Sequence, residues 1–338
     1  MPESNLGQLS TLLIYGAMAA YMVALVAFAI DLSGLRDRGP EGRRRRAVGI
    51  AMSTTWLGAG LHLVGVATRG IAAGRVPWAN MYEFSILATL VAVAIFLALQ
   101  RGRDLRILGT FVVGPVLLML GVAVSVLYVR ADGVQPALQS YWLVIHVSIA
   151  TAAVGVFGIA AMLSAVQLVQ ERAELRRGRE AEAGAGDLAL VGSAGAATAG
   201  AAHAVAGRGG SGAAGAPSGA GRPGFWGRVL EVVPSSAELE RISFRLNAVG
   251  FMMWTFTVIA GAIWAEHAWG RPWGWDPKEV WSFVIWVVYA AYLHARATRG
   301  WEGRRAAYLS LFGFVCILGN YFVVNLLFNG LHSYSGIG

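Results

Sequence analysis

Eight stretches of about 20 mostly apolar residues recur along the chain, each long enough to cross the roughly 30 Å hydrocarbon core of a bilayer as an α-helix. They cover residues 11–33, 48–68, 81–99, 107–128, 141–168, 247–269, 277–295 and 306–328. The residues before the first stretch contain no Lys or Arg, so we expect this stretch to be retained as a span rather than cleaved as a signal peptide. The pattern predicts an all-α integral membrane protein with eight transmembrane helices.

The basic residues test this helix count independently, because cytoplasmic loops of membrane proteins are enriched in Lys and Arg. Alternate connections between the eight stretches hold 22 and 5 of the 27 basic residues. The poorer set consists of Arg69, Arg75, Arg130, Arg271 and Lys278. We therefore predict that both termini are extracytoplasmic. The net charge of +8 then reflects membrane topology rather than binding to nucleic acid.

The composition supports the prediction of a membrane protein and limits the kinds of cysteine site that the chain can form. Hydrophobic residues make up 56% of the chain and charged residues 14%, whereas about 25% of residues are charged in a typical soluble protein. The single cysteine, Cys316, excludes an intrachain disulfide and a thiolate zinc cluster built from this chain alone. Any thiol chemistry is therefore expected to belong to a partner.

The connections divide the chain into three expected parts. Residues 1–170 hold the first five spans, residues 171–246 form a flexible cytoplasmic loop, and residues 247–338 hold the last three spans with an external loop. The middle part begins as a charged helical extension and is Ala/Gly-rich up to about residue 223. Such a composition buries too little apolar surface to offset its chain entropy, which predicts flexibility.

Half of the 12 tryptophans lie between positions 264 and 286, around the external connection that precedes the seventh span. They are Trp264, Trp269, Trp273, Trp275, Trp281 and Trp286. One explanation is an interfacial aromatic belt, but a belt would scatter its rings over many helix ends. Concentration at one connection favours a platform for a flat apolar ligand.

The motif Asp276-Pro277-Lys278-Glu279 has a structural and a functional explanation. Asp at the N-cap, Pro at the first helical position and Glu at the third are typical of a capping box that starts a helix. Asp276 and Glu279 are therefore assigned to capping first and to ligand contact second. Lys278, the only lysine in the chain, and Arg271 could neutralise a ligand carboxylate or could be solvated interfacial charges.

Two histidines are predicted at the depth of the tryptophan cluster. His146 lies about six residues into the fifth span from its outer end, and His332 lies four residues past the eighth span. Two neutral imidazoles that converge on one planar, aromatic-lined site match the axial ligands of a haem iron. Zinc would need a third or fourth protein ligand, for which only His267 and carboxylates are nearby.

Two further histidines lie inside predicted spans, where an ionisable group is costly and usually functional. The 18 residues between Asp276 and His294 place His294 roughly 27 Å inward, near the cytoplasmic edge, on one helical face with Phe283 and Val287. His62 lies in the outer half of the second span. Either could instead be hydrogen-bonded within the helix bundle.

The tryptophan-rich block from Trp269 to Trp281 resembles the WWD signature of haem-handling membrane proteins. Its continuation through Tyr289, Tyr292 and His294 is similar to the CcsA (ResC) family of system II cytochrome c biogenesis. Further matches to that family are Pro77, Asn80, Tyr82, Glu83, Tyr141-Trp142-Leu143, His146-Val147 and Gly330-Leu331-His332-Ser333-Tyr334. The resemblance covers nearly the whole chain except for residues 171–223.

The resemblance implies a multi-pass protein of the cell membrane that binds haem b and presents it at the extracytoplasmic face, where the CxxCH thiols of apocytochrome c add to the haem vinyl groups. It also implies a part in haem export and a membrane partner of the CcsB or ResB type. The chain would then be the haem-presenting subunit of a cytochrome c synthase (haem lyase) complex. We do not expect it to be a complete enzyme by itself.

The resemblance also assigns roles to individual residues. His146 and His332 would be the axial ligands, and His294 would belong to an intramembrane haem site. The remaining candidate haem contacts are Trp269, Trp273, Trp275, Asp276, Trp281, Arg271 and Lys278. The residues indicate no general acid or base, so we expect catalysis mainly by positioning.

Three alternatives remain from the sequence. A system I type of protein would deliver haem to a chaperone without forming thioethers. A small-solute transporter would show repeated halves with helices broken at the midplane, and neither is evident here. A purely structural membrane subunit would carry no chromophore.

Overall fold

The computed structural model describes residues 4–37, 41–101, 105–131, 140–202, 230, 232–328 and 330–331. Within these ranges every regular element is a helix. The elements are α1 (Asn5–Asp37), α2 (Glu41–Ala73), α3 (Met81–Leu99), η1 (Arg106–Leu108), α4 (Gly109–Ser125), α5 (Tyr141–Ala202), α7 (Ser236–Trp269), α8 (Pro277–Arg299), α9 (Arg304–Leu318), η3 (Gly319–Val324) and α10 (Asn325–Leu327).

Seven helices in the described residues are long and apolar enough to cross a membrane. They are α1, α2, α3, α5, α7, α8 and the continuous run from α9 to α10. The eighth apolar helix, α4, has only 17 residues and contains Pro115, which removes one intrahelical hydrogen bond. The chain is therefore an all-α, multi-pass membrane protein, as the hydrophobic pattern predicted, although its fourth helix is shorter than the expected stretch 107–128.

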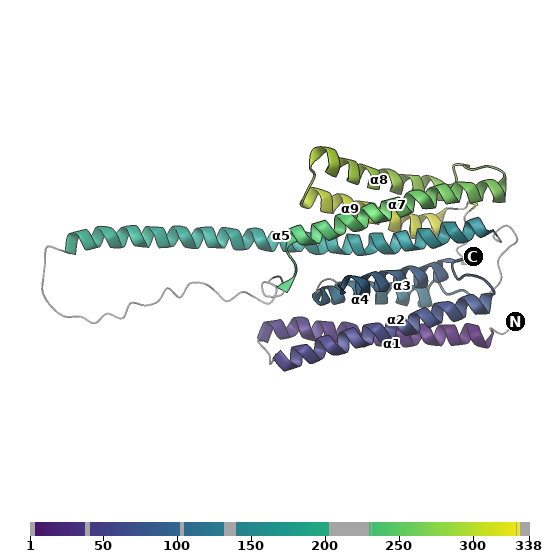
Figure 1. Cartoon of the computed structure of the whole chain (residues 1–338), viewed down its shortest axis with the longest axis horizontal. Coiled ribbons are helices and arrows are strands. Elements are labelled where there is room, and N and C mark those ends of the chain that lie inside the picture. The colour runs from purple at the N-terminus through teal and green to yellow at the C-terminus, as the bar shows by residue number, and fades with distance from the viewer. Residues whose placement is uncertain are drawn as a thin grey trace.

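The helices form two groups that lie side by side (Figure 1). One group contains α1 to α4, and the other contains α5, α7, α8 and α9. The groups meet where α3 packs against α5. Gly155 of α5 makes this close approach possible, because a Cβ atom at this position would lie 2.7 Å from Cγ1 of Val91 in α3. Small residues have the same role at many helix contacts in membranes.

The positions of the helix ends show at which end of the bundle each connection lies. The start of α1, the α7–α8 connection and the end of α10 lie at the same end of the bundle (Figure 1). We call this the tryptophan end, because it holds the tryptophan-rich connection. An even number of crossings brings the first and last helices to one side, in agreement with the eight predicted stretches.

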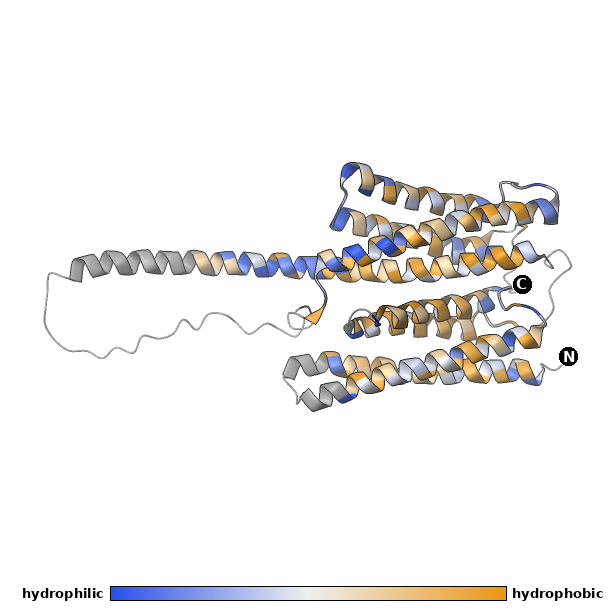
Figure 2. Ribbon diagram, in the orientation of Figure 1, coloured by the Kyte–Doolittle hydropathy of each residue, from blue (hydrophilic) through white to orange (hydrophobic). Residues whose placement is uncertain are grey.

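Helix α5 continues beyond the bundle to Ala202, and α7 begins at Ser236. The charged extension that the sequence predicts as helical is therefore helical, and the helix runs on into the Ala/Gly-rich residues. Ala, Glu and Arg, which are strong helix formers, dominate the first turns of the extension and outweigh the composition argument there. Figure 2 shows that the extension is more hydrophilic than the bundle. Residues 203–229 lie outside the described residues.

Side chains anchor the base of this extension to the bundle. Glu171 forms an ion pair with Arg304 at the start of α9, with 3.2 Å between Oε1 and Nε. The side-chain amide of Gln170 donates a hydrogen bond to the carbonyl of Val233 over 3.2 Å. These contacts hold α5, α7 and α9 together at the end opposite to the tryptophans.

Candidate functional site

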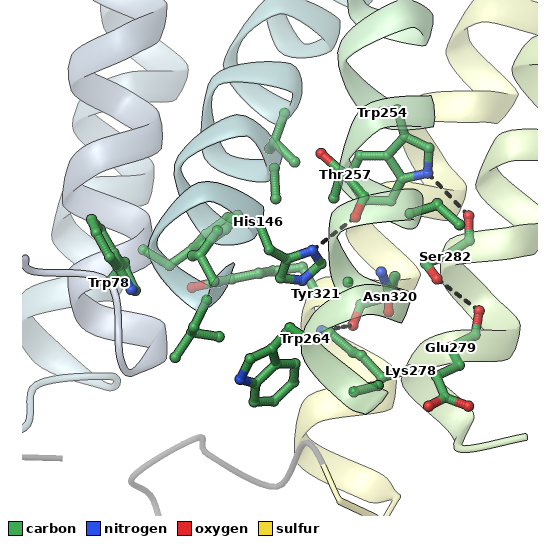
Figure 3. Close-up of a pocket in the computed structure, with 18 of the residues that line it drawn as sticks. Trp78, His146, Trp254, Thr257, Trp264, Lys278, Glu279, Ser282, Asn320 and Tyr321 are labelled. Carbon is green, nitrogen blue, oxygen red and sulfur yellow. Dashed lines mark hydrogen bonds between the residues drawn. The ribbon is translucent and has the colours of Figure 1, made fainter. Parts of the chain in front are cut away.

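A cavity of about 220 Å³ opens at the tryptophan end, between the two groups of helices. Its walls come from the residues at and before the start of α3, from α5, α7, α8 and η3, and from the α7–α8 connection. The lining is mostly apolar, with polar groups from His146, Thr257, Lys278 and Asn320 (Figure 3). An apolar pocket with a few convergent polar groups is typical of a ligand site.

His146 lies in the cavity wall with its ring held by α7 (Figure 3). Its Nδ1 lies 2.8 Å from the carbonyl oxygen of Thr257. Because a carbonyl only accepts hydrogen bonds, Nδ1 carries the proton, and Nε2 of the neutral imidazole carries the lone pair. The ring stacks on Trp264, with 6.4 Å between centroids and 13° between planes. A second hydrogen bond of this kind is what orients a metal-binding imidazole.

Gly261 provides the space for this ring. A Cβ atom at position 261 would lie 2.7 Å from Cε1 and 2.9 Å from Nδ1 of His146, closer than real Cβ atoms approach other atoms. Trp254, Thr257, Gly261 and Trp264 all line the cavity and repeat at three- to four-residue intervals, so they share one face of α7.

The tryptophan cluster is divided by the structure into different environments. Trp264 and Trp273 line the cavity. Trp269 packs edge-on against Trp264, with 4.7 Å between ring centroids. Trp281 and Trp286 do not line the cavity: Trp281 packs beside Gly319, and Trp286 donates a hydrogen bond to Thr255 Oγ1 over 2.9 Å. The structure thus places two of the six tryptophans of the cluster, Trp264 and Trp273, in the cavity wall.

The α7–α8 connection is shaped by its caps. Gly270 ends α7 with a left-handed backbone, φ 68°, as is common at helix C-termini. Asp276 and Glu279 form the predicted capping box at the start of α8. Glu279 Oε2 accepts hydrogen bonds from the amides of Gly274 and Asp276 over 2.8 and 3.1 Å. These bonds fix the connection as an ordered wall.

Trp275 is the one non-glycine residue with positive φ among the described residues, at 59°. Its side chain is 76% exposed, whereas the neighbouring Trp273 is partly buried. The two rings pack at 88° with 5.9 Å between centroids. A left-handed backbone at a bulky residue is strained and typical of functional sites.

The two cations of the loop differ in their surroundings. Arg271 is exposed, and its guanidinium packs over Gly274, where a Cβ atom would lie 2.5 Å from Cζ. Lys278 lines the cavity, and its Nζ donates hydrogen bonds to the carbonyl of Asn320 and to Oδ1 of Asn325 over 3.0 and 2.7 Å. Since an ammonium has three donors, these two bonds leave capacity for one more acceptor.

Three other histidines of the described residues, His62, His267 and His294, do not line the cavity. His294 is exposed on α8, on the same side as the exposed Phe283 and Val287. His62 is fully buried between α1 and α2, with 3.3 Å from its Nδ1 to the Tyr21 hydroxyl. His267 is exposed and donates from Nδ1 to the Ile263 carbonyl. His332 lies outside the described residues, as does His203.

Trp78 and Trp254 line the cavity although sequence reasoning did not select them. Both are single tryptophans outside the cluster, which is typical of an interfacial belt. Trp254 could have been selected from the sequence, because its spacing from Trp264 places both on one face of the same helix. Trp78 lies beside Pro77 and Asn80, two of the residues that match the CcsA family.

A buried charge cluster supports the wall that contains Trp78. Glu83 of α3 is fully buried and accepts hydrogen bonds from Arg69 Nε over 3.0 Å and from Arg75 Nη1 over 2.6 Å. The amide of Ala79 donates to the same carboxylate over 3.0 Å, and Arg69 also bonds to the carbonyl of Val129. The carboxylate thus ties α2 to the segment before α3, and Arg69 extends the cluster to the segment after α4.

Comparisons with known proteins show which family the chain belongs to. The family described as "Cytochrome C assembly protein" matches residues 78–332, which include every element of the cavity. The chain is 34% identical to the cytochrome c biogenesis protein CcsA of Gloeobacter violaceus, in an alignment that covers 99% of this chain and 98% of that one. For CcsA of Synechococcus elongatus the identity is 35%, with 80% and 82% covered.

A solved structure shows the same fold. The cytochrome c haem lyase CcmF aligns with a TM-score of 0.58 at 13% sequence identity. The alignment covers 100% of this chain and 49% of that chain, so this chain spans about half the length of CcmF. At this identity the likeness concerns the arrangement of helices alone.

Proposed function

The chain belongs to the cytochrome c assembly protein family, with the CcsA proteins of cytochrome c biogenesis as relatives, and on that premise we propose that it binds haem b at the tryptophan end and presents it for thioether attachment to apocytochrome c. In this proposal haem is a substrate that the chain holds and orients. The CxxCH thiols of apocytochrome c add across the haem vinyl groups, so that each sulfur bonds to one vinyl carbon and the proton passes to the other.

The observation that carries this proposal is the state of His146. Its Nδ1 is committed to the Thr257 carbonyl, which leaves the lone pair of the neutral ring on Nε2. Imidazole in this tautomer, next to an aromatic wall, is suited to bind haem iron. We propose His146 as one axial ligand and His332, which lies outside the described residues, as the other.

The cavity dimensions indicate how haem would lie. At about 220 Å³ the cavity is smaller than the roughly 300–1,000 Å³ of pockets that enclose a whole ligand. Part of the porphyrin would therefore enter beside His146, and the rest would lie against the rim formed by Trp273 and Trp275, with Trp269 supporting Trp264 behind it. Lys278 and Arg271 are the cations proposed to meet the haem propionates.

The proposed orientation places the tryptophan end at the extracytoplasmic face of the cell membrane. The basic connections, including the projecting part of α5, then face the cytoplasm, as the charge distribution requires. A CcsB or ResB type of membrane partner is proposed to complete the synthase. This chain would supply its haem-presenting subunit.

His294 is proposed to contact haem separately from this cavity. It lies on α8 at an exposed position, with Phe283 and Val287 exposed on the same side. Haem at this place would rest on the surface of the bundle, with lipid or the partner on its other side. The 18-residue separation from Asp276 corresponds to roughly 27 Å along the helix, so haem export would need a transfer between the two places.

The proposed mechanism relies on positioning. Tryptophan rings hold the porphyrin face, and two imidazoles fill both axial positions of the iron. The histidine of CxxCH would replace one of them and bring both thiols to the vinyl groups. Holding the reactants together in this way supplies the rate advantage, while the bond-forming chemistry belongs to haem and thiol.

Visible absorption spectra of the detergent-purified protein test the proposed ligand. We expect a six-coordinate, low-spin haem in the wild type that is lost in His146→Ala and restored by added imidazole. Gly261→Ala leaves the histidine in place but occupies the space of its ring, so we expect the same loss. Gly158→Ala is the matched control, because its Cβ would meet Phe314 at an ordinary 3.6 Å.

An unchanged spectrum in both His146→Ala and Gly261→Ala would contradict the proposed ligand. Thioether formation is measured separately, by haem staining of denatured cytochrome c in cells that express the chain with its partner. Solute transport or a purely structural role predicts that no thioether product depends on this chain, whereas delivery of haem to a chaperone predicts haem loading of that chaperone before any thioether forms.

A further inference from the structure

Asn320 of η3 lies in the cavity wall with a hydrogen-bond acceptor that has no partner. The residue is only 6% exposed and lines the cavity (Figure 3). Among the described residues, no donor reaches its side-chain oxygen Oδ1. A buried polar atom without a partner is costly and calls for a group that completes it. The oxygen therefore points to a ligand group that occupies this part of the cavity.

Three hydroxyl groups of the same wall differ from Asn320 in this respect. The hydroxyls of Thr257, Ser282 and Tyr321 line the cavity and donate to backbone carbonyls over 3.0, 2.7 and 2.8 Å. Their hydrogen atoms are thus used within the chain. Asn320 is the residue of this wall that presents an unsatisfied polar group next to a cation.

That cation is Lys278. Its Nζ donates to the backbone carbonyl of Asn320 and to Oδ1 of Asn325 over 3.0 and 2.7 Å, which leaves one ammonium N–H for a further acceptor. Of the described residues that line the cavity, Lys278 is the only Lys or Arg. The carboxylate of Glu279 also lines the cavity, but two backbone amides of the α7–α8 connection donate to it. The positive charge is therefore available to an anionic ligand.

We propose that Lys278 and Asn320 form a subsite for one carboxyl group of the ligand, and that this group is a haem propionate. The inference rests on the proposed function and makes Asn320 a specificity-determining residue that sequence reasoning did not select. One carboxyl oxygen accepts the remaining N–H of Lys278. The other bonds to the Asn320 amide, which turns its NH2 toward an ionised carboxylate or its oxygen toward a protonated one.

The subsite determines which edge of the porphyrin is enclosed. In haem b the two propionates lie on the edge of the ring opposite to the two vinyl groups. A cavity of about 220 Å³ holds part of the ring and not the whole. With one propionate at Asn320, the propionate edge is the part inside. The vinyl edge is then left at the opening, where the thiols of apocytochrome c can reach it.

Metal-free protoporphyrin IX and its dimethyl ester test the subsite, because they differ only at the carboxyl groups and need no iron ligand. Their dissociation constants are measured by porphyrin fluorescence with the full-length protein in detergent, after subtraction of empty micelles. We expect the wild type to bind the free acid roughly tenfold more tightly than the ester, as hydrogen bonds to a charged group predict. A role of Asn320 in folding alone would weaken both ligands equally and leave this ratio unchanged.

Two variants of Asn320 make this test specific. Asn320→Leu has a similar branched shape but cannot bond to a carboxyl group, so we expect the preference for the acid to fall several-fold. Asn320→Asp places a carboxylate beside Lys278 that repels the one on the ligand, so we expect the ester to bind at least as well as the acid. Asn5→Asp is the matched control, because it adds the same charge at an exposed position of the tryptophan end outside the cavity.

Equal dissociation constants for the acid and the ester in the wild type would overturn the subsite. A preference for the acid that is unchanged in both variants of Asn320 would also overturn it. A preference lost in these variants and kept in Asn5→Asp would support it.

A probe without a porphyrin separates this proposal from the proposed function. Lys278 is the only lysine in the chain, so its acylation by an amine-reactive ester is read at one peptide by mass spectrometry. We expect sodium dodecanoate to slow this acylation several-fold in the wild type but not in Asn320→Asp, and methyl dodecanoate to have no effect. Such protection in a protein that binds neither porphyrin would contradict the proposed function and still support the subsite. No protection in such a protein would overturn both.

Discussion

Trp275 combines a strained backbone with an exposed aromatic ring. Its φ is 59°, and 76% of its surface is accessible. A left-handed backbone costs an L-residue roughly 1–2 kcal/mol, and burial of the ring repays little of this in the structure. The cost is reasonable if the ring is held outward to meet the flat face of a ligand.

Replacement by glycine separates these two features. We expect Trp275→Gly to leave the protein as stable as the wild type or more stable, by about 1 kcal/mol, because glycine adopts positive φ freely. The same variant should retain several-fold less haem. Thermal unfolding and the ratio of haem to protein measure the two effects.

Trp275→Ala is the companion variant, since it also removes the ring but keeps the backbone strain. We expect it to lose as much haem as Trp275→Gly without the gain in stability. Haem retention equal to the wild type in both variants would show that the ring does not contact the ligand.

Single residues also show what the sequence could and could not predict. His146 was selectable because an ionisable side chain in an apolar span is costly, and the structure places it in the cavity wall. Its orientation depends on Thr257 and Gly261, which belong to another helix and carry no signal of their own. The exposure of His294 likewise depends on which faces of α8 its neighbours cover.

At the scale of elements, η3 interrupts the last helix with a π-helical segment, Gly319–Val324. A π turn contains more residues than an α turn, and the carbonyl of Asn320 in this segment accepts a hydrogen bond from Lys278 Nζ. The polar side chain of Asn325 bonds to the same ammonium. The segment therefore connects the last helix to the start of α8.

Deletion of Val323 tests this connection. The side chain is 43% exposed, so its loss removes little packing, but one residue fewer converts the π turn to an α turn and directs the carbonyl of Asn320 to an amide of its own helix instead of Lys278 Nζ. We expect unchanged helical content by circular dichroism and at least several-fold lower haem retention. Val323→Ala is the control and should retain haem. Normal retention in the deletion would argue against a role for η3 in the site.

Hydropathy does not reveal η3, because a π segment and an α-helix present the same run of apolar residues. Composition also gave the charged start of the α5 extension as helical but not how far the helix continues. Low apolar content predicts that a segment does not pack, but it does not prevent helix formation by Ala, Glu and Arg. Helix ends, by contrast, carried local signals, and the capping box at Asp276 and Glu279 forms as predicted.

At the scale of the whole molecule, alternation of basic and non-basic connections predicted that the first and last helices share one end of the bundle. The partners of each helix were not predictable in this way. A membrane helix is apolar both where it faces lipid and where it packs on a neighbour, so the division into two groups and the position of the cavity between them had no sequence signal.

The buried charge cluster around Glu83 connects α2 with the segments before α3 and after α4. The contribution of the Glu83 charge to stability can be tested. Glu83→Gln leaves Arg69 and Arg75 without their buried counter-charge, and breaking a buried pair in this way typically costs about 3–5 kcal/mol. We expect a lower temperature of unfolding, measured by size-exclusion chromatography of heated, detergent-solubilised protein. The wall containing Trp78 should also lose support, because Gln offers one acceptor oxygen where the carboxylate offers two to Arg69, Arg75 and Ala79.

Arg304→Gln is the matched control for this prediction. It breaks the ion pair with Glu171. The side chains of Arg304 and Glu171 are 44% and 24% exposed, and exposed pairs contribute about 0–1 kcal/mol. We therefore expect little change in its unfolding temperature. Equal effects of the two variants would show that burial of the Glu83 cluster does not matter for stability.

The cavity draws its walls from positions as early as Trp78 and as late as Asn325, and this has a consequence for biosynthesis. A chain that is still emerging from the ribosome has not yet made α8, η3 and α10. Its cavity therefore lacks Lys278 and the wall that the α7–α8 connection forms. The proposed haem site is complete only when the last helix is inserted. On the proposed function, truncated or stalled chains would therefore not capture haem, a reactive molecule, before the protein is finished.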